Sequence, residues 1–453
     1  MAIIASTLNR IKSDALGCLG GADFVNGCFA AAGHVWRRRV LDPATTVSLF
    51  VLQILHGNTG IGHLPHLSGL DVSDSAYCDA RSRLPVAAVA GLVERLCRQC
   101  GRCVEAAAWL GRRVLMADAT GTLTPDTAAL GQEWPQPSSQ KPGCGFPAVK
   151  LLGLLDLATG MIVHLTATCL RSHEFSLLAG PHSALRKGDV LLADRGFCSF
   201  WHLAMLAAMS VDAVFRMHQR QVVDFTPDRP CRGTSGKKYR TGLPGSRFVR
   251  RLGHEDQVVE WRRPPTRPAW MTPEQFAAVP ATLEVRELRY RVVARGRRTR
   301  VVTVATTLLD AMRYPKREVA RLYGLRWEIE TDFRHLKTTL KMEHLKCKSV
   351  EGVLKELMIY VLVYNLVRAA MSAAAARRAI RDANRVSFID ALRWLCSRLT
   401  GGPAATEPDL KVNPPRPGRC CPRVRKRRMK EYDLMNKPRA QYAQPQSEAE
   451  VGG

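Results

Sequence analysis

The chain has 453 residues, 46% of them hydrophobic, so it can bury a sizeable core and is not an intrinsically disordered protein. Its 67 lysines and arginines outnumber the 40 aspartates and glutamates and give a formal net charge of +27. Because such an excess of positive charge repels itself unless a polyanion binds, the composition favours nucleic acid as a partner. It argues against a purely structural protein without a charged partner.

The sequence gives little support for membrane insertion, secretion or metal binding by cysteine. The longest apolar stretch, residues 357–367, is shorter than the roughly 18 residues of a spanning helix, so we expect no contact with a membrane. The N-terminus lacks a basic segment followed by an apolar one, which predicts a cytoplasmic protein. The fourteen cysteines are scattered. Cys97, Cys100 and Cys103 have no second Cys or His pair at a suitable distance, which favours helix thiols over a zinc site.

Residues 1–110 read as a helical N-terminal region. Apolar residues recur with helical periodicity over residues 45–55 and 86–97, and glycine-rich turns separate these segments. Arg37, Arg38 and Arg39 form a local positive patch. This patch is either a solvated charge run or part of a DNA-binding region.

Residues 111–217 have the pattern of a mixed α/β core. Two short apolar, strand-like runs end in an acid, Asp118 in the first case and Asp194 in the second. Further strands and helices are expected in the order hairpin 148–157 and 161–170, helix 174–185, strand 189–193, helix 200–209 and strand 213–217.

Residues 218–304 differ in composition and read as a basic, β-rich insertion, with 19 Lys and Arg against 8 Asp and Glu and a period-two segment over 282–293. Helices are then expected over 316–340, 349–380 and 387–399. We assign residues 305–370 to a second part of the core and residues 371–453 to C-terminal helices and a basic tail. The stretch 411–439 carries 11 Lys and Arg and predicts an extended, phosphate-binding arm.

One polar face of the helix expected over 316–340 carries the most specific pattern in the chain. At about 100° per residue, Tyr323, Arg326, Glu330 and Lys337 fall within a face about 60° wide, beside an apolar stripe. The neighbouring acids of this helix fall elsewhere. Surface ion pairs are common on helices, so this face alone does not establish a site.

Asp118 and Asp194, which end two expected strands, make a functional site more plausible than a surface ion pair. Carboxylates at adjacent strand ends, with a third from a helix on the same sheet, can bind Mg²⁺ or Mn²⁺. Two such ions can assist an in-line phosphoryl transfer. We therefore predict that Asp118, Asp194 and Glu330 are the catalytic and metal-binding residues. Asp126 and Asp156 are the nearest competitors of Asp118, although Asp156 precedes a hairpin turn and reads as structural.

These residues resemble the DDE transposases of bacterial insertion sequences, in the subgroup with the signature Tyr-x2-Arg-x3-Glu-x6-Lys. Tyr323, Arg326, Glu330 and Lys337 match its spacing completely. Residues 191–197 look like the motif of the second Asp. Asp118-Ala119-Thr120 resembles the motif of the first, although the family commonly has Gly where Ala119 stands. The resemblance extends over roughly residues 35–440.

The resemblance implies an RNase H-like catalytic core that the β-rich insertion interrupts between the second Asp and the Glu. It implies an enzyme that binds double-stranded DNA at the transposon's terminal repeats and at the target, as a homodimer in a synaptic complex at the bacterial nucleoid. It also implies a cut-and-paste route in which the freed 3′-hydroxyl forms a hairpin before the end is joined to target DNA. In this subgroup Tyr323, Arg326 and Lys337 would hold DNA phosphate.

Several assignments stay open at the level of sequence. Arg216, at the end of a strand, either contacts DNA phosphate or forms an ion pair. Hairpin formation needs an aromatic residue that receives a flipped base, and Trp261, Trp270 and Trp327 are candidates that packing explains equally well. An inactive or domesticated DNA-binding protein on this scaffold, or an RNase H-like nuclease that cuts without joining, would share much of the pattern.

Overall fold

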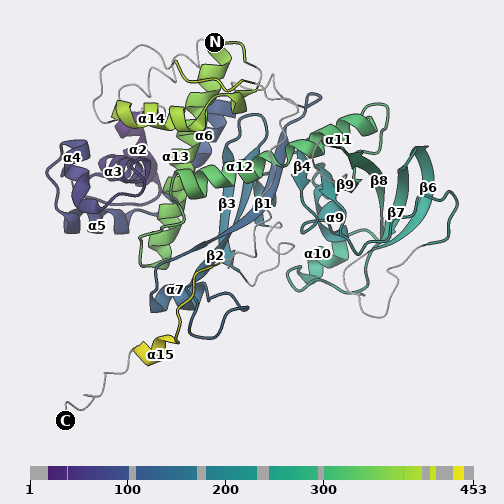
Figure 1. Cartoon of the computed structure of the whole chain (residues 1–453), viewed down its shortest axis with the longest axis horizontal. Helices are drawn as coiled ribbons and strands as arrows, with labels where there is room; N and C mark the ends of the chain where they lie inside the picture. Colours follow the sequence, from purple (N-terminus) through teal and green to yellow (C-terminus); the bar gives the residue numbers. More distant parts are fainter. Residues whose placement is uncertain are drawn as a thin grey trace, which may run out of the picture.

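The computed structural model describes residues 19–37, 39–101, 109–170, 180–231, 244–293, 300–380, 382–399, 409–414 and 432–442. These residues build one nine-stranded sheet in the order β3-β2-β1-β4-β5-β9-β8-β7-β6, with helices around it (Figure 1). The mixed α/β architecture expected from the sequence is confirmed.

The first half of the sheet holds the two strands that end in acids. Its strands are β1 (Val114–Leu123), β2 (Ala148–Asp156), β3 (Ile162–Cys169), β4 (Val190–Ala193) and β5 (Asp212–Arg216). β2 and β3 form the predicted antiparallel hairpin, and β1 also pairs antiparallel with β2. β4 lies parallel to both β1 and β5, so these three strands run in one direction.

The second half of the sheet comes from the basic, β-rich stretch of the sequence. Its strands are β6 (Gly245–Gly253), β7 (Asp256–Arg262), β8 (Thr282–Val292) and β9 (Arg300–Thr306). They form an antiparallel meander in which β9 returns to pair with β5. This stretch therefore continues the same sheet (Figure 1).

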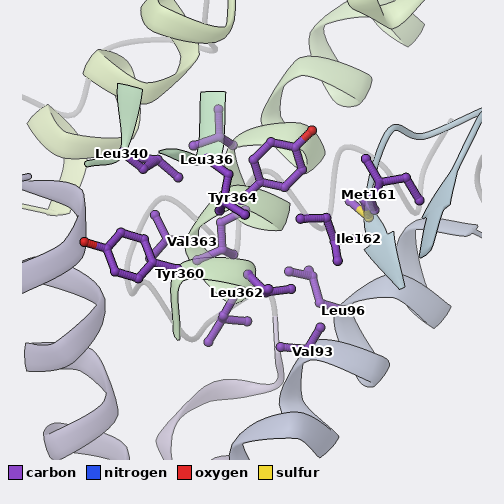
Figure 2. Close-up of a cluster of buried hydrophobic side chains, with 14 of the residues drawn as sticks. Val93, Leu96, Met161, Ile162, Leu336, Leu340, Tyr360, Leu362, Val363 and Tyr364 are labelled. Carbon is purple, nitrogen blue, oxygen red and sulfur yellow. The ribbon is translucent and has the colours of Figure 1, made fainter. Parts of the chain in front are cut away.

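The N-terminal helices pack on one another and on a long central helix. They are α2 (Gly21–Ala31), α3 (Pro43–Leu55), α4 (Leu64–Ser68), α5 (Asp74–Arg83) and α6 (Val86–Gly101). The central helix α13 (Val350–Arg377) contacts α3, α6, β3 and α14 (Phe388–Leu399). Figure 2 shows part of this core, where Val93 and Leu96 of α6 and Ile162 of β3 meet Leu362 and Tyr364 of α13.

Helix α13 corrects one expectation. By length and composition it could span a membrane, with a mean hydropathy of 1.6 over its best window, although the sequence led us to expect no such segment. The charged residues Glu356 and Arg368 bound the apolar run 357–367, which is why the run looks too short in the sequence. In the fold 89% of that window is buried inside the protein, so α13 serves as a core helix.

The two faces of the sheet are covered by separate apolar cores. Strand residues alternate between faces, and Met116 and Leu192 belong to the larger core with α13, whereas Leu115 and Leu191 belong to the smaller one. The smaller core includes α9 (Phe200–Ala208). Further short helices are α7 (Ala128–Glu133), α10 (Pro273–Ala278) and α15 (Arg439–Tyr442), with 3-10 turns at Ile61–His63, Gly180–Ala184 and Ala383–Arg385.

Four expectations fall partly outside the described residues. The first half of the helix expected over 174–185 does, and the described half contains the turn Gly180–Ala184. Arg38 and Cys103 do as well, while the Cys97 thiol donates to the carbonyl of Ile162 within the core. Of the expected basic arm, 411–414 and 432–439 are described. These segments lie on the folded protein through bridges at Val412 and Leu434.

Candidate active site

Asp118 and Asp194 lie side by side on one face of the sheet. The parallel pairing of β1 and β4 places Ala117 opposite Ala193, and each aspartate is the next residue. Adjacent strands are about 4.8 Å apart, and alternation puts both carboxylates on the face of Met116 and Leu192. This is the face against which α12 (Glu328–Arg334) packs, since α12 contacts β1.

The helix expected over 316–340 is divided into three parts. α11 (Lys316–Leu325) ends before Arg326, α12 begins at Glu328, and the last turn, His335–Thr339, is a π-helix. The prediction of one uninterrupted α-helix was therefore wrong. Arg326 and Trp327 nevertheless keep right-handed helical backbone angles. Tyr323, Arg326 and Lys337 still reach the sheet, and Glu330 lies beside Arg326.

Arg326 connects two of the three predicted catalytic acids. Its Nη1 lies 3.3 Å from Oδ2 of Asp118, and its Nη2 lies 3.6 Å from Oε1 of Glu330. The Arg326 side chain is only 4% exposed, whereas that of Glu330 is 51% exposed. One buried guanidinium thus lies between a strand acid and a helix acid.

The third acid, Asp194, is held by two other polar side chains. The Tyr323 hydroxyl donates to Oδ1 of Asp194 at 3.3 Å, and Nη1 of Arg216 lies 3.9 Å from the same oxygen. Burial raises the pKa of Tyr323 well above its ordinary value, so the hydroxyl keeps its proton and acts as a donor. Arg216, at the end of β5, therefore lies within ion-pair distance of Asp194, and its role toward DNA phosphate stays a prediction.

Electrostatics keep Arg326 charged inside the protein. Burial alone would lower its pKa, but Tyr323 and the carboxylates of Asp194, Asp118 and Glu330 together raise it. The Nε atom of Arg326 is buried without a hydrogen-bond partner among the described residues. An arginine with an unused donor is poised to gain a further acceptor, because burial of an unpaired donor costs free energy.

Lys337 reaches the same strand from the π-helical turn. Its ammonium donates to the carbonyl of Gly121 at 2.8 Å, three residues beyond Asp118. A Cβ atom at Gly121 would lie against the hydroxyl of Tyr432. The sequence pointed to Lys337 but gave no sign of Gly121, since a backbone acceptor leaves no mark on residue type.

The other acids near these segments have structural partners. Asp126 accepts a forked hydrogen bond from Arg439 of the C-terminal segment. Asp156 caps the β2–β3 turn by accepting from the backbone and hydroxyl of Thr159. Asp332 is buried and lies 3.8 Å from Arg368 of α13. These three carboxylates therefore stabilise the fold.

The donor atoms suit a hard divalent cation, although their present arrangement does not form a metal cage. Carboxylate oxygens are the preferred ligands of Mg²⁺ and Mn²⁺. Among the described residues, however, no three acids, histidines or cysteines lie close enough together to hold an ion. The Arg326 guanidinium supplies the positive charge between Asp118 and Glu330 in this arrangement.

The chain is similar in sequence to known transposases. Residues 109–366 match the family model described as "Transposase DDE domain". The chain is 26% identical over 378 residues to the transposase InsG for insertion sequence element IS4 of Escherichia coli (strain K12), a match covering 80% of this chain and 78% of that protein. A piggyBac transposase in a synaptic complex with hairpin DNA covers 88% of this chain, which covers 80% of that one, with a TM-score of 0.43 and 11% identity.

Proposed function

The chain belongs to the DDE transposases, and from this premise we propose that Asp118, Asp194 and Glu330 carry its chemistry. The observation that supports these three acids best is the charge cluster around Arg326. Three acids from distant segments converge there: Arg326 contacts Asp118 and Glu330 directly, and its charge interacts with that of Asp194.

We propose that these carboxylates hold divalent Mg²⁺ or Mn²⁺, two ions in the active complex. Such ions would supply a more acidic water and stabilise charge on the phosphodiester. The chain's own contribution is to bring the acids together and to offset their repulsion with Arg326 until cations bind. Arg326 would then be released from Asp118 and Glu330 to accept a different partner.

The new partner of Arg326 is a DNA phosphate in this proposal. A guanidinium binds two phosphate oxygens at once, and the unused Nε of Arg326 is available for such a contact. Lys337 and Arg216 add two further positive charges, and the Tyr323 hydroxyl supplies a neutral donor. Together these four side chains would hold the strand against the acids.

A hairpin intermediate requires a side chain on which a flipped base can stack. Trp261 is 1% exposed and donates to the buried Glu287, and Trp270 stacks on His202 with ring centroids 5.2 Å apart. Trp327 is 45% exposed at the break between α11 and α12. The guanidinium carbon of Arg326 lies 5.1 Å from its ring centroid, and this position favours Trp327 as the base-receiving residue.

The wider layout follows the same proposal. The strand order β3-β2-β1-β4-β5, with β2 antiparallel to β1 and with β4 and β5 parallel to it, supports an RNase H-like core over 111–217 and 305–370. Residues 218–304 would be its insertion, 1–110 a DNA-binding region and 371–453 a C-terminal region. The partner is double-stranded DNA, terminal repeats and target, bound by a homodimer that holds two ends together.

The test compares acids on the same helix and on the adjacent strands. Purified protein is incubated with DNA that contains the element's ends and Mg²⁺. Asp194→Ala and Glu330→Gln should abolish cleavage and retain salt-sensitive DNA binding, whereas Glu328→Gln on the same helix should still cleave. Undiminished cleavage by Asp194→Ala would overturn the assignment. Nicked products without hairpins or joined strands would favour a nuclease, and an inactive native protein would favour a domesticated DNA-binding protein.

A further inference from the structure

The ends of β8 and β9 extend beyond the sheet as a two-stranded ribbon. β8 pairs with β7 only up to Leu288, and β9 pairs with β5 only from Val304 onward. Residues 289–292 and 300–303 form strand pairs only with each other. This β8–β9 ribbon, defined as 289–293 and 300–303, is held at its base, where the Arg289 N–H donates to the carbonyl of Glu255 and the carbonyl of Thr303 accepts from the Met217 N–H. At about 3.4 Å per residue it projects roughly 10 Å beyond these bonds.

The ribbon combines positive charge with exposed apolar side chains. Val292, Val293 and Val301 are 44%, 77% and 54% exposed. Arg291 and Arg300 are exposed and have no acidic partner within the described residues, and the ribbon itself contains no Asp or Glu. Val302 and Tyr290 pack on the core, so the exposed valines and the arginines are the part of this surface that a partner would cover and neutralise.

The ribbon lies against the predicted catalytic residues. Residues opposite one another in an antiparallel pair share a face, and Val302 and Tyr290 face the same core as Leu288 and Val304. Arg300 lies on this face, with its guanidinium carbon 5.9 Å from the ring centroid of Trp327. The Trp327 ring in turn lies beside Arg326, which contacts Asp118 and Glu330.

We propose that the β8–β9 ribbon binds the DNA duplex that carries the cleaved phosphodiester, with Arg291 and Arg300 on phosphates and the valines against the groove. This inference rests on the proposed function. A two-stranded ribbon fits the major groove, which is about 12 Å wide. A second copy of the chain is a poorer partner for this surface, since each copy carries a net charge of +27.

The experiment measures the salt dependence of binding to an end-containing duplex. The double variant Arg291→Ala/Arg300→Ala should reduce the slope of log K against log salt by roughly 1.8, at about 0.9 for each phosphate that is no longer neutralised. Arg251→Ala/Arg262→Ala, which removes the same charge from exposed positions on β6 and β7, should leave the slope unchanged. Affinity in the ribbon variant should fall more than the single-turnover cleavage rate at saturating DNA.

Each result of this experiment supports or overturns the binding of DNA by the ribbon. An unchanged slope in the ribbon variant overturns the proposal, as does an equal fall in both double variants, which would indicate only a general loss of charge. If sedimentation shows that the ribbon variant loses self-association while its DNA slope stays the same, the ribbon is a protein interface. The proposed function fails separately, through cleavage by Asp194→Ala, so the two failures are distinguishable.

Discussion

Arg326 and Asp118 are 208 residues apart in sequence, yet their side chains meet at 3.3 Å in the middle of the fold. The contact joins the break between α11 and α12 to β1 and lies where the sheet carries two adjacent acids. It gives the buried guanidinium a carboxylate partner on the strand and a second one, Glu330, on α12. Arg326 is therefore the residue through which helix and strand are coupled.

Replacing Arg326 by lysine should separate geometry from charge. Lys keeps the positive charge but cannot contact Asp118 and Glu330 with two nitrogens, nor a phosphate bidentately. We expect Arg326→Lys to lower the rate of strand cleavage by about 100-fold, which corresponds to roughly 2.7 kcal/mol. Single-turnover cleavage of end DNA measures this. Arg334→Lys, at an exposed position of α12, is the control, and an equal loss there would remove the special role of Arg326.

Replacing Tyr323 by phenylalanine should weaken the hold on Asp194. The change deletes only the hydroxyl that donates to Asp194 at 3.3 Å. Since a hydrogen bond to a charged group contributes about 1.5–3 kcal/mol, and this one is long, we expect cleavage to slow by roughly tenfold. As a control, Tyr360→Phe removes a buried hydroxyl of α13, which donates to the carbonyl of Lys341. It should reduce stability without slowing cleavage at saturating DNA.

The local parts of this site could be predicted from the sequence because they depend on short-range periodicity. Strand alternation and the runs that end in Asp118 and Asp194 predict acids at strand ends, and helical spacing predicts the face that holds Tyr323 and Lys337. The break at Arg326–Trp327 was missed because no proline marks it. The face survived the break because both residues keep helical backbone angles.

Long-range features could not be predicted in this way. Nothing in residues 218–304 indicates that β9 would pair with β5 and continue the core sheet, since pairing partners depend on tertiary packing. The buried pair of Asp332 and Arg368 joins α12 to α13, and each residue reads as a surface charge in the sequence. The choice among Trp261, Trp270 and Trp327 also needed the structural surroundings of each side chain, because three residues of the same type cannot be distinguished by type alone.

Trp327 offers a test of the hairpin step alone. Loss of a stacking surface costs about 1–3 kcal/mol per base, so Trp327→Ala should lower the yield of hairpin ends by roughly tenfold while the first nick is less affected. Trp327→Phe, which keeps an aromatic ring, should restore most of the yield. Gel analysis of nicked and hairpin products measures both. Equal slowing of nicking and hairpin formation would instead assign Trp327 to general DNA binding.

Glu328, two residues before the proposed catalytic Glu330, indicates a pH dependence of stability. Burial, together with Asp382 and Asp332, raises the pKa of Glu328 to about 7, from 4.5. The folded protein therefore binds more protons than the unfolded chain between these values, and this group makes stability fall as pH rises from about 4.5 to 7. Asn384 donates to its carboxylate at 2.7 Å, a bond that glutamine can accept.

Glu328→Gln should therefore stabilise the protein at pH 8 by about 1–2 kcal/mol, less than the full pKa shift implies because the side chain is partly exposed. At pH 4.5 the glutamate is protonated in the fold, so the difference in the free energy of unfolding between variant and native protein should shrink. Denaturant unfolding at several pH values measures it. Glu343→Gln, at an exposed position, should show no such trend. A difference that does not change between pH 4.5 and 8 would show that folding leaves the pKa of Glu328 unchanged and that burial has little effect on it.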